Sequence, residues 1–149
     1  MQWRRKRGAD LQAIGRSRGG RTTKIHAVAD RRGRLIGFDL TPGQRSDIRA
    51  ANDLLAKLPK ADHLLGDTAY DSDDLRGSLA ERGTTPVIKP NPRRKNVPAF
   101  DTTIYKLRNL IERAFAHLKD WRRVATRYDK LKRNFSATVA LAAIIIWWT

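Results

Sequence analysis

Residues 101–121 read DTTIYKLRNLIERAFAHLKDW. Neither Pro nor Gly interrupts it, and residues that favour helices, such as Leu, Ala, Arg and Lys, recur along it. The carboxylate of Asp101 can accept hydrogen bonds from the backbone N–H groups of a first helical turn. The stretch therefore predicts a long helix that starts just after Asp101.

Two faces of this predicted helix differ in character. At about 100° per residue, a broad apolar stripe faces a core and contains Leu107, Leu110, Ile111, Ala114, Phe115 and Leu118. A second face, about 60° wide, gathers Tyr105, Arg108, Glu112 and Lys119. Periodicity by itself favours a solvated face there, because Arg and Glu four residues apart add only about 0.2–0.5 kcal/mol to an exposed helix.

The charge of the chain points to a polyanionic partner. Its 149 residues are enough for one domain with a core, and 31 Lys and Arg residues against 15 acidic ones give a formal charge of +16. Basic residues are spread along the sequence, which favours nucleic acid, although a membrane surface also attracts such charge. The absence of Cys excludes disulfides and thiolate zinc sites and fits a reducing cytoplasm. The histidines are scattered without ligand spacing.

Residues 1–21 are rich in Arg and Gly and lack periodicity, which predicts a flexible basic arm. Arg16 and Arg18 in this arm are candidates for contacts with DNA phosphates, and a disordered cationic tail explains the same composition equally well. Residues 1–8 are basic but have no apolar segment, unlike a secretory signal.

The apolar run from Ala137 to Trp148 predicts a buried closing helix. A membrane span needs about 20 apolar residues, and this run is shorter, so we expect no membrane partner. Trp147 and Trp148 are expected to pack against a sheet, with an exposed dimer contact as the alternative.

The sequence between the arm and the long helix predicts a hairpin followed by alternating helices and strands. Thr22–Ala29 and Arg34–Leu40 alternate, and Ile36, Phe38 and Leu40 are expected together on one side of the second strand. Arg31–Gly33 suits a three-residue hairpin loop whose Gly takes the left-handed conformation. The further segments are a helix over Asp47–Leu58, a strand over Asp62–Gly66, a helix opened by Asp71 and Asp74 and closed by Gly83, a strand over Thr85–Lys89 and a loop over Pro90–Pro98. This order predicts an α/β fold with a mixed sheet flanked by helices.

The spacing within the long helix resembles that of a known family. Tyr105, Arg108, Glu112 and Lys119 match the Y-R-E-K signature of bacterial insertion-sequence transposases of the DDE class. Asp67, in Gly66-Asp67-Thr68-Ala69-Tyr70, resembles the block around that family's second catalytic Asp. The segments that are similar to the insertion-sequence-five family in particular are Trp121–Leu131, Gly15–Gly20 and Thr23–His26.

The resemblance implies a ribonuclease-H-like fold and a DNA strand-transfer activity. It implies that residues 22–149 form the catalytic domain, lacking the first strand of that fold, after the arm over residues 1–21. Asp67 and Glu112 would be catalytic residues and ligands of Mg²⁺ or Mn²⁺, and their carboxylates would approach closely enough to share an ion. The residues expected to contact DNA are Tyr105, Arg108, Lys119, Arg122, Arg123 and Arg127, with Arg16 and Arg18 in the arm.

The first catalytic Asp of the family has no clear counterpart in this chain. Asp30 opens a hairpin loop and Asp39 ends a strand, so both have structural explanations. We therefore expect a downstream-frame or truncated product that is inactive alone and acts as a homo-oligomer or with an upstream-frame partner, in the bacterial cytoplasm at the nucleoid. One alternative is a non-catalytic DNA-binding fragment that competes with intact transposase. A basic RNA-binding protein is another, but it leaves the Y-R-E-K spacing unexplained.

Overall fold

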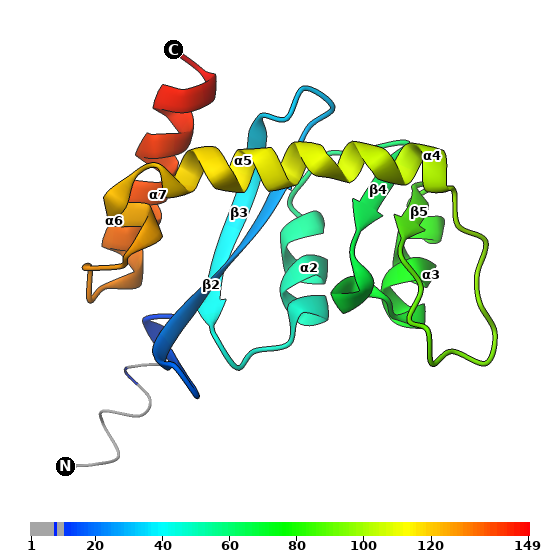
Figure 1. Cartoon of the computed structure of the whole chain (residues 1–149), viewed down its shortest axis with the longest axis horizontal. Coiled ribbons are helices and arrows are strands. Elements are labelled where there is room, and N and C mark those ends of the chain that lie inside the picture. Colours follow the sequence, from blue (N-terminus) through cyan, green and yellow to red (C-terminus); the bar gives the residue numbers. More distant parts are fainter. Residues whose placement is uncertain (1–7, 9–10) are drawn as a thin grey trace. The chain divides into compact units, whose positions relative to one another are not determined.

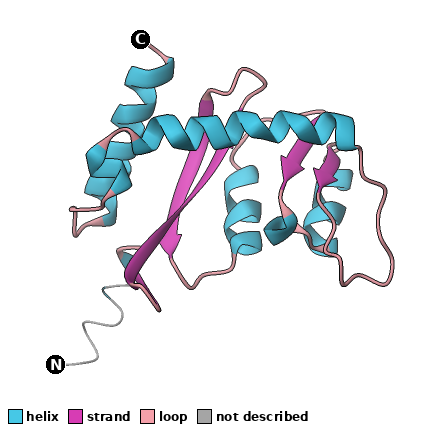
Figure 2. Cartoon of the chain, viewed as in Figure 1, coloured by secondary structure: helices cyan, strands magenta, loops and turns pink. Residues whose placement is uncertain are grey.

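The computed structural model describes residue 8 and residues 11–149, and Figure 1 shows the chain. It divides into two compact units, each described by itself. The first unit contains the described residues up to Arg45 together with Leu110–Thr149. The second unit contains Ser46–Asn109. Figure 2 shows that strands and helices occur in both.

The first unit contains an antiparallel sheet in the order β1 (Gly15–Ser17), β2 (Gly20–Ala29) and β3 (Leu35–Pro42). The turn between β2 and β3 places Gly33 at φ +77°, as predicted for the hairpin loop. The side chain of Asp30 fixes this turn by accepting hydrogen bonds from the backbone N–H groups of Arg32 and Arg34.

Two sequence predictions fail in this sheet. The flexible arm predicted over residues 1–21 is wrong for residues 15–21, because β1 pairs with the start of β2; residues 1–7 and 9–10 lie outside the described residues. Ile36 was predicted on the same side of the strand as Phe38 and Leu40, yet it is 40% exposed while Leu35 and Leu40 are buried. The reason is a bulge, since Ala29 pairs with Leu35 and Val28 with Gly37.

Helices of the first unit cover a core that also involves this sheet. They are α5 (Asn109–Lys119), all but its first residue, α6 (Arg122–Ala125) and α7 (Lys132–Trp147). Buried Ala114 and Leu118 on α5 confirm part of the predicted apolar stripe. The core cluster consists of Ala13, Leu35, Leu40, Leu118, Val124, Phe135, Val139, Ala142 and Ala143. Trp147 packs against this core, whereas Trp148 is 53% exposed with the guanidinium of Arg34 over its ring at 4.5 Å.

The second unit is built around a parallel pair of strands, β4 (His63–Gly66) and β5 (Thr85–Ile88). Its helical elements are α2 (Asp47–Leu55), the 3₁₀ turn η1 (Thr68–Tyr70), α3 (Asp73–Glu81), α4 (Thr102–Tyr105) and the 3₁₀ turn η2 (Lys106–Arg108). Apolar side chains from α2, α3 and β5 are buried here, and they include Ala50, Leu54, Leu75, Leu79, Val87 and Ile88. The antiparallel and parallel pairings expected of a mixed sheet are thus present in two separate sheets.

The predicted long helix is helical from Thr102 to Lys119, through α4, η2 and α5. Asp101 caps its start as predicted, because the carboxylate accepts from the N–H groups of Thr103 and Ile104 at 2.9 and 3.0 Å. Leu107 was predicted in the apolar stripe but is 56% exposed, since it lies on the 3₁₀ turn, where the helical repeat tightens. No helix in the described part of the chain has both the length and the apolar composition needed to cross a membrane.

Candidate functional site

Asp67 stands at the C-terminal end of β4, where the chain turns into η1. Its Oδ1 atom accepts a hydrogen bond from the N–H of Ala69 at 3.0 Å, so the carboxylate caps the turn. The Asp67 side chain is 47% exposed. A carboxylate is therefore held at a strand end with access to solvent.

Arg108, a member of the Y-R-E-K spacing, lies beside Asp67 in the second unit, and a second member, Tyr105, packs against Arg108. The Nη1 atom of Arg108 is 4.0 Å from the Oδ2 atom of Asp67. The guanidinium of Arg108 also lies over the ring of Tyr105, 5.6 Å from its centroid, and Tyr105 packs edge-on against Phe100 at 4.8 Å. The helix start thus brings a cation and an aromatic ring to the acidic turn, although the two residues are far from Asp67 in sequence.

Tyr70 adds a hydroxyl to the same turn. Burial raises the pKa of Tyr70 to about 12, and the negative charges of Asp47 and Asp67 contribute in the same direction. The phenol therefore stays protonated across the physiological range.

The other two members of the spacing belong to the first unit. Glu112 lies in the first turn of α5 and Lys119 is its last residue, and both are exposed. Asp67 and Glu112 belong to different units, so their shared ion remains a prediction.

The resemblance implies a divalent metal ion. The side-chain donors of the described residues can be compared with the ligands that such an ion prefers. Mg²⁺ and Mn²⁺ prefer carboxylate oxygens, and the solvent-exposed carboxylate of Asp67 fits one such ligand. Within residue 8 and residues 11–149, however, no group of three or more His, Cys, Asp or Glu side chains is gathered for a metal. The described residues therefore match one ligand of such an ion and not a complete site.

Arg127 makes hydrogen bonds within the fold, and the DNA contact predicted for it stays a prediction. Its guanidinium donates to backbone oxygens of Gln12, Ala13, Asp129 and Lys130 and to the hydroxyl of Thr23, at 2.7–3.3 Å. Its guanidinium carbon also lies 5.1 Å from the ring centroid of Phe135. With its donors used in this way, Arg127 holds residues 12–13 and 129–130 together.

The remaining arginines predicted to contact DNA are exposed. Arg16 lies on β1, Arg18 lies in the turn that follows, and Arg122 and Arg123 lie on α6. Arg123 makes a 3.3 Å ion pair with Asp129 and keeps 65% of its side chain exposed. Their placement is compatible with the predicted contacts, which stay predictions.

Asp71 is a residue whose importance the sequence did not reveal. It was expected to support a helix N-terminus, but its fully buried carboxylate receives Arg76 at 2.9 Å, Arg94 at 2.7 Å and the N–H of Asn91 at 2.7 Å. Burial by itself raises the pKa of Asp71, but the hydrogen bonds from Arg94, Asn91 and Arg76 outweigh it and lower that pKa to about 2. The basic run Arg93–Lys95 was the available hint, but no local pattern links it to an acid 23 residues away.

Comparison with known proteins assigns the chain to a class. Residues 3–147 match the family described as "Transposase DDE domain", and the chain belongs to this family. It is similar to "Putative transposase for insertion sequence element IS6501" of Brucella ovis, with 42% identity over 85% of this chain and 98% of the relative. It is also similar to "Putative transposase for insertion sequence element IS402" of Burkholderia cepacia, with 28% identity over 85% of this chain and 63% of that relative. No solved structure matches significantly.

Proposed function

We propose that this chain is the catalytic domain of an insertion-sequence transposase of the insertion-sequence-five type, with a ribonuclease-H-like fold, that cuts and joins DNA strands. The family match over residues 3–147 and the names of both relatives support this function. The observation that carries it is the exposed carboxylate of Asp67 at the end of β4, with Arg108 4.0 Å away.

Asp67 and Glu112 are the proposed catalytic acids and the proposed ligands of Mg²⁺ or Mn²⁺. When bound, such ions would neutralise the charge that develops on the leaving oxygen of a phosphodiester. Arg108 is suited to contact a phosphate, because its guanidinium lies 4.0 Å from the carboxylate of Asp67 and can donate two parallel hydrogen bonds to phosphate oxygens. Tyr70 lies on the turn that follows Asp67, and the ring of Tyr105 packs against Arg108.

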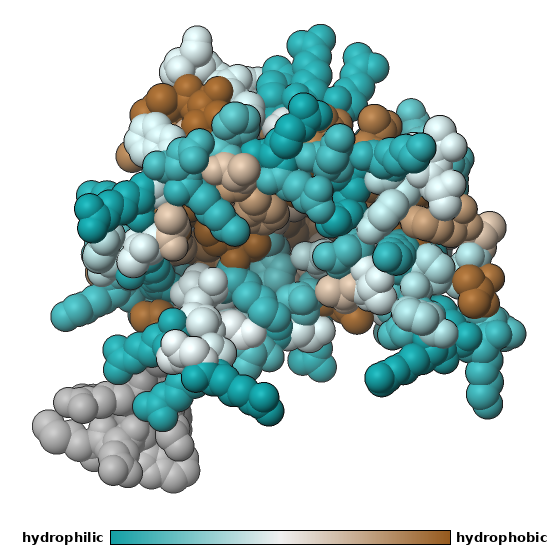
Figure 3. All heavy atoms as spheres, in the orientation of Figure 1, coloured by the Kyte–Doolittle hydropathy of each residue, from teal (hydrophilic) through white to brown (hydrophobic). Residues whose placement is uncertain are grey.

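The proposed partner is DNA, both the ends of the element and its target. The formal charge of +16 supports this choice, because cationic side chains release counterions from the DNA backbone. Figure 3 shows hydrophilic side chains over much of one face, as such a charge requires. A second copy of the chain is the further proposed partner, and the proposed place of action is the bacterial nucleoid, where the DNA lies.

Strand cleavage tests the proposed activity. The chain is incubated with supercoiled plasmid and Mn²⁺, and nicking is compared for the wild type, Asp67→Asn and Glu112→Gln. If the two acids are catalytic, each substitution lowers nicking about 100-fold or more. Asp74→Asn and Glu81→Gln remove exposed acids of the same types on α3 and are the matched controls.

The outcomes separate the two functions considered. Nicking that both substitutions abolish and both controls retain supports the transposase. DNA binding without any metal-dependent nicking agrees with the expected inactivity of the chain alone and supports a fragment that competes with intact transposase. Calorimetry adds a direct measure, because Glu112→Gln should weaken Mn²⁺ binding while Glu81→Gln does not.

A further inference from the structure

The loop between β5 and α4 is a basic segment to which the proposed reaction assigns no part. It carries Arg93, Arg94 and Lys95 in succession, between Pro90 and Pro98. The side chain of Arg94 is 19% exposed, whereas Arg93 and Lys95 are exposed residues. Three prolines within nine residues restrict the backbone of this loop.

A buried acid fixes the shape of the loop. The carboxylate of Asp71 is inaccessible to solvent and binds Nε of Arg94 at 2.7 Å and the N–H of Asn91 at 2.7 Å. Nη1 of Arg94 reaches Asp73 at 2.7 Å as well. The N–H of Arg93 donates to the side chain of Asn91 at 2.9 Å. The middle of the loop is therefore held by hydrogen bonds from α3 and from the segment before it.

The same contacts tie the loop to the turn that bears Asp67. The N–H of Lys89 donates to the carbonyl of Gly66 at 3.1 Å, so the start of the loop lies beside the residue that precedes Asp67. Asp71 directly follows η1, whose first residue follows Asp67. The candidate catalytic turn and the basic loop thus share one hydrogen-bonded framework in the second unit.

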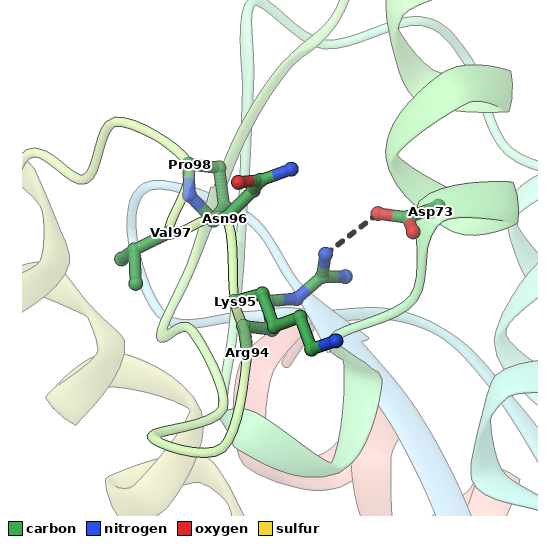
Figure 4. A pocket seen from close by; sticks show the side chains of 6 residues that line it. All are labelled: Asp73, Arg94, Lys95, Asn96, Val97 and Pro98. Atoms are coloured by element: carbon green, nitrogen blue, oxygen red, sulfur yellow. Dashed lines mark hydrogen bonds and ion pairs between the residues drawn. The ribbon is translucent and has the colours of Figure 1, made fainter.

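The three positive charges of the loop differ in whether acidic side chains pair with them. Figure 4 shows a shallow pocket lined by Asp73, Arg94, Lys95, Asn96, Val97 and Pro98, with Arg94 pointing to Asp73. The charge of Arg94 is balanced by Asp71 and Asp73. Among the described residues, the side chains of Arg93 and Lys95 make no ion pair, so their positive charges face solvent.

We propose that Asn91–Val97 is a preformed loop that contacts DNA phosphates through Arg93 and Lys95, with Asp71 as the positioning residue. The loop would hold the strand on which Asp67 acts, which rests on the function proposed above. A loop that is already ordered loses less conformational entropy on binding DNA than a flexible loop does. The contacts of Arg93 and Lys95 therefore contribute more to the DNA affinity.

Salt-dependent DNA binding tests the proposal on the full chain. The affinity for a labelled 30-base-pair duplex is measured by fluorescence anisotropy over a range of KCl concentrations. Log affinity falls with log salt concentration, and each phosphate contact contributes about 0.9 to the steepness of that fall. Arg93→Gln with Lys95→Gln should therefore make the fall less steep by about 1.8. Arg49→Gln with Lys57→Gln removes two exposed charges elsewhere in the same unit and is the matched control.

The results distinguish this proposal from the proposed function. An equal or smaller loss in the loop variant than in the control overturns the loop assignment while leaving DNA binding in place. A wild-type chain that does not bind the duplex at low salt removes the proposed function itself.

The positioning role of Asp71 has its own test. Asp71→Asn removes a negative charge, and charge alone would tighten DNA binding. If Asp71 positions the loop, the variant instead loses affinity, and adding Arg93→Gln with Lys95→Gln then costs less than in the wild type. Asp74→Asn makes the same charge change at an exposed site and should bind at least as tightly as the wild type. Full additivity of the Asp71 and loop substitutions, with both variants folded by circular dichroism, refutes the positioning role.

Discussion

Arg127 in the first unit and Asp71 in the second do similar work with opposite chemistry. Each is a charged side chain drawn into the fold, and each ties together segments distant in sequence. The guanidinium of Arg127 donates to backbone carbonyls and a hydroxyl, which carry no formal charge. The carboxylate of Asp71 accepts from two arginines, which carry positive charges.

This difference determines how the contacts of each charged residue respond to pH. Burial lowers the pKa of Arg127, and the charge of Asp129 acts in the opposite direction. An arginine nevertheless stays protonated in proteins, so its cluster has no titration near neutral or acid pH. Asp71 titrates near pH 2 because its arginine partners favour the ionised carboxylate. Carbonyl acceptors thus give a cluster insensitive to pH, and an ionised acid gives one that fails in acid.

The largest effect is expected from Arg127→Ala. The substitution leaves the partly buried carbonyls of Gln12 and Asp129 without the Arg127 donor, and each such group costs about 1–3 kcal/mol. We expect a loss of about 3 kcal/mol or more in the free energy of unfolding, measured with urea. Arg127→Lys should recover only part of it, because an ammonium lacks the planar fork. Arg123→Ala, at an exposed site, should stay within about 0.5 kcal/mol; a similar loss there would contradict the role of Arg127.

The next effect is expected from Asp71→Asn. The amide keeps the shape of the side chain but removes the charge that two arginines share. We expect a loss of about 2–3 kcal/mol in the free energy of unfolding, below the range for fully buried pairs because both arginines keep some access to water. Unfolding in urea provides the measurement, with Asp74→Asn as the exposed control. Equal stability of the two variants would show that the Asp71 cluster contributes little.

Low pH should weaken the contribution of Asp71 to stability and leave that of Arg127 unchanged. The pKa of Asp71 is about 2 in the folded chain against an ordinary value of 3.8, so the folded state favours the ionised form. Its contribution, on the order of 2 kcal/mol, is present above pH 3.8 and is lost as the pH falls through about 2. The stability difference between wild type and Asp71→Asn should therefore shrink between pH 5 and pH 2. The difference for Arg127→Ala should not change over the same range, and parallel changes in both would refute the comparison.

The smallest effect concerns neighbours within the basic loop. Arg94→Gln removes contacts to Asp71 and Asp73 and should lower the free energy of unfolding by less than Asp71→Asn does. Arg93→Gln and Lys95→Gln should each stay within about 0.5 kcal/mol, because their side chains are exposed. Thermal unfolding of the three variants checks this order. A cost for Arg93→Gln equal to that for Arg94→Gln would show that the loop is held in another way.

Local patterns were enough to predict much of the fold. The cap at Asp101 and the left-handed Gly33 follow from interactions and conformational preferences within a few residues. Between residues 20 and 119, strands and helices were also placed close to their observed bounds, because alternation and helical spacing are local signals. The terminal helix starts at Lys132, five residues before the apolar run that predicted it. The bulge at Val28 and Ala29 escaped, since it depends on pairing between strands and not on either strand alone.

The sequence by itself determined the family, the helix with its Y-R-E-K spacing and Asp67 at the end of a strand, because these depend on residues near one another or on spacing. Only the tertiary structure decided what Arg127 and Asp71 do. Their partners lie up to 115 and 23 residues away, and nothing in the neighbouring sequence marks an arginine as a donor to buried carbonyls or an aspartate as the anchor of a loop. Burial of a charge is stable only where all its partners converge, and that convergence exists only in the folded chain.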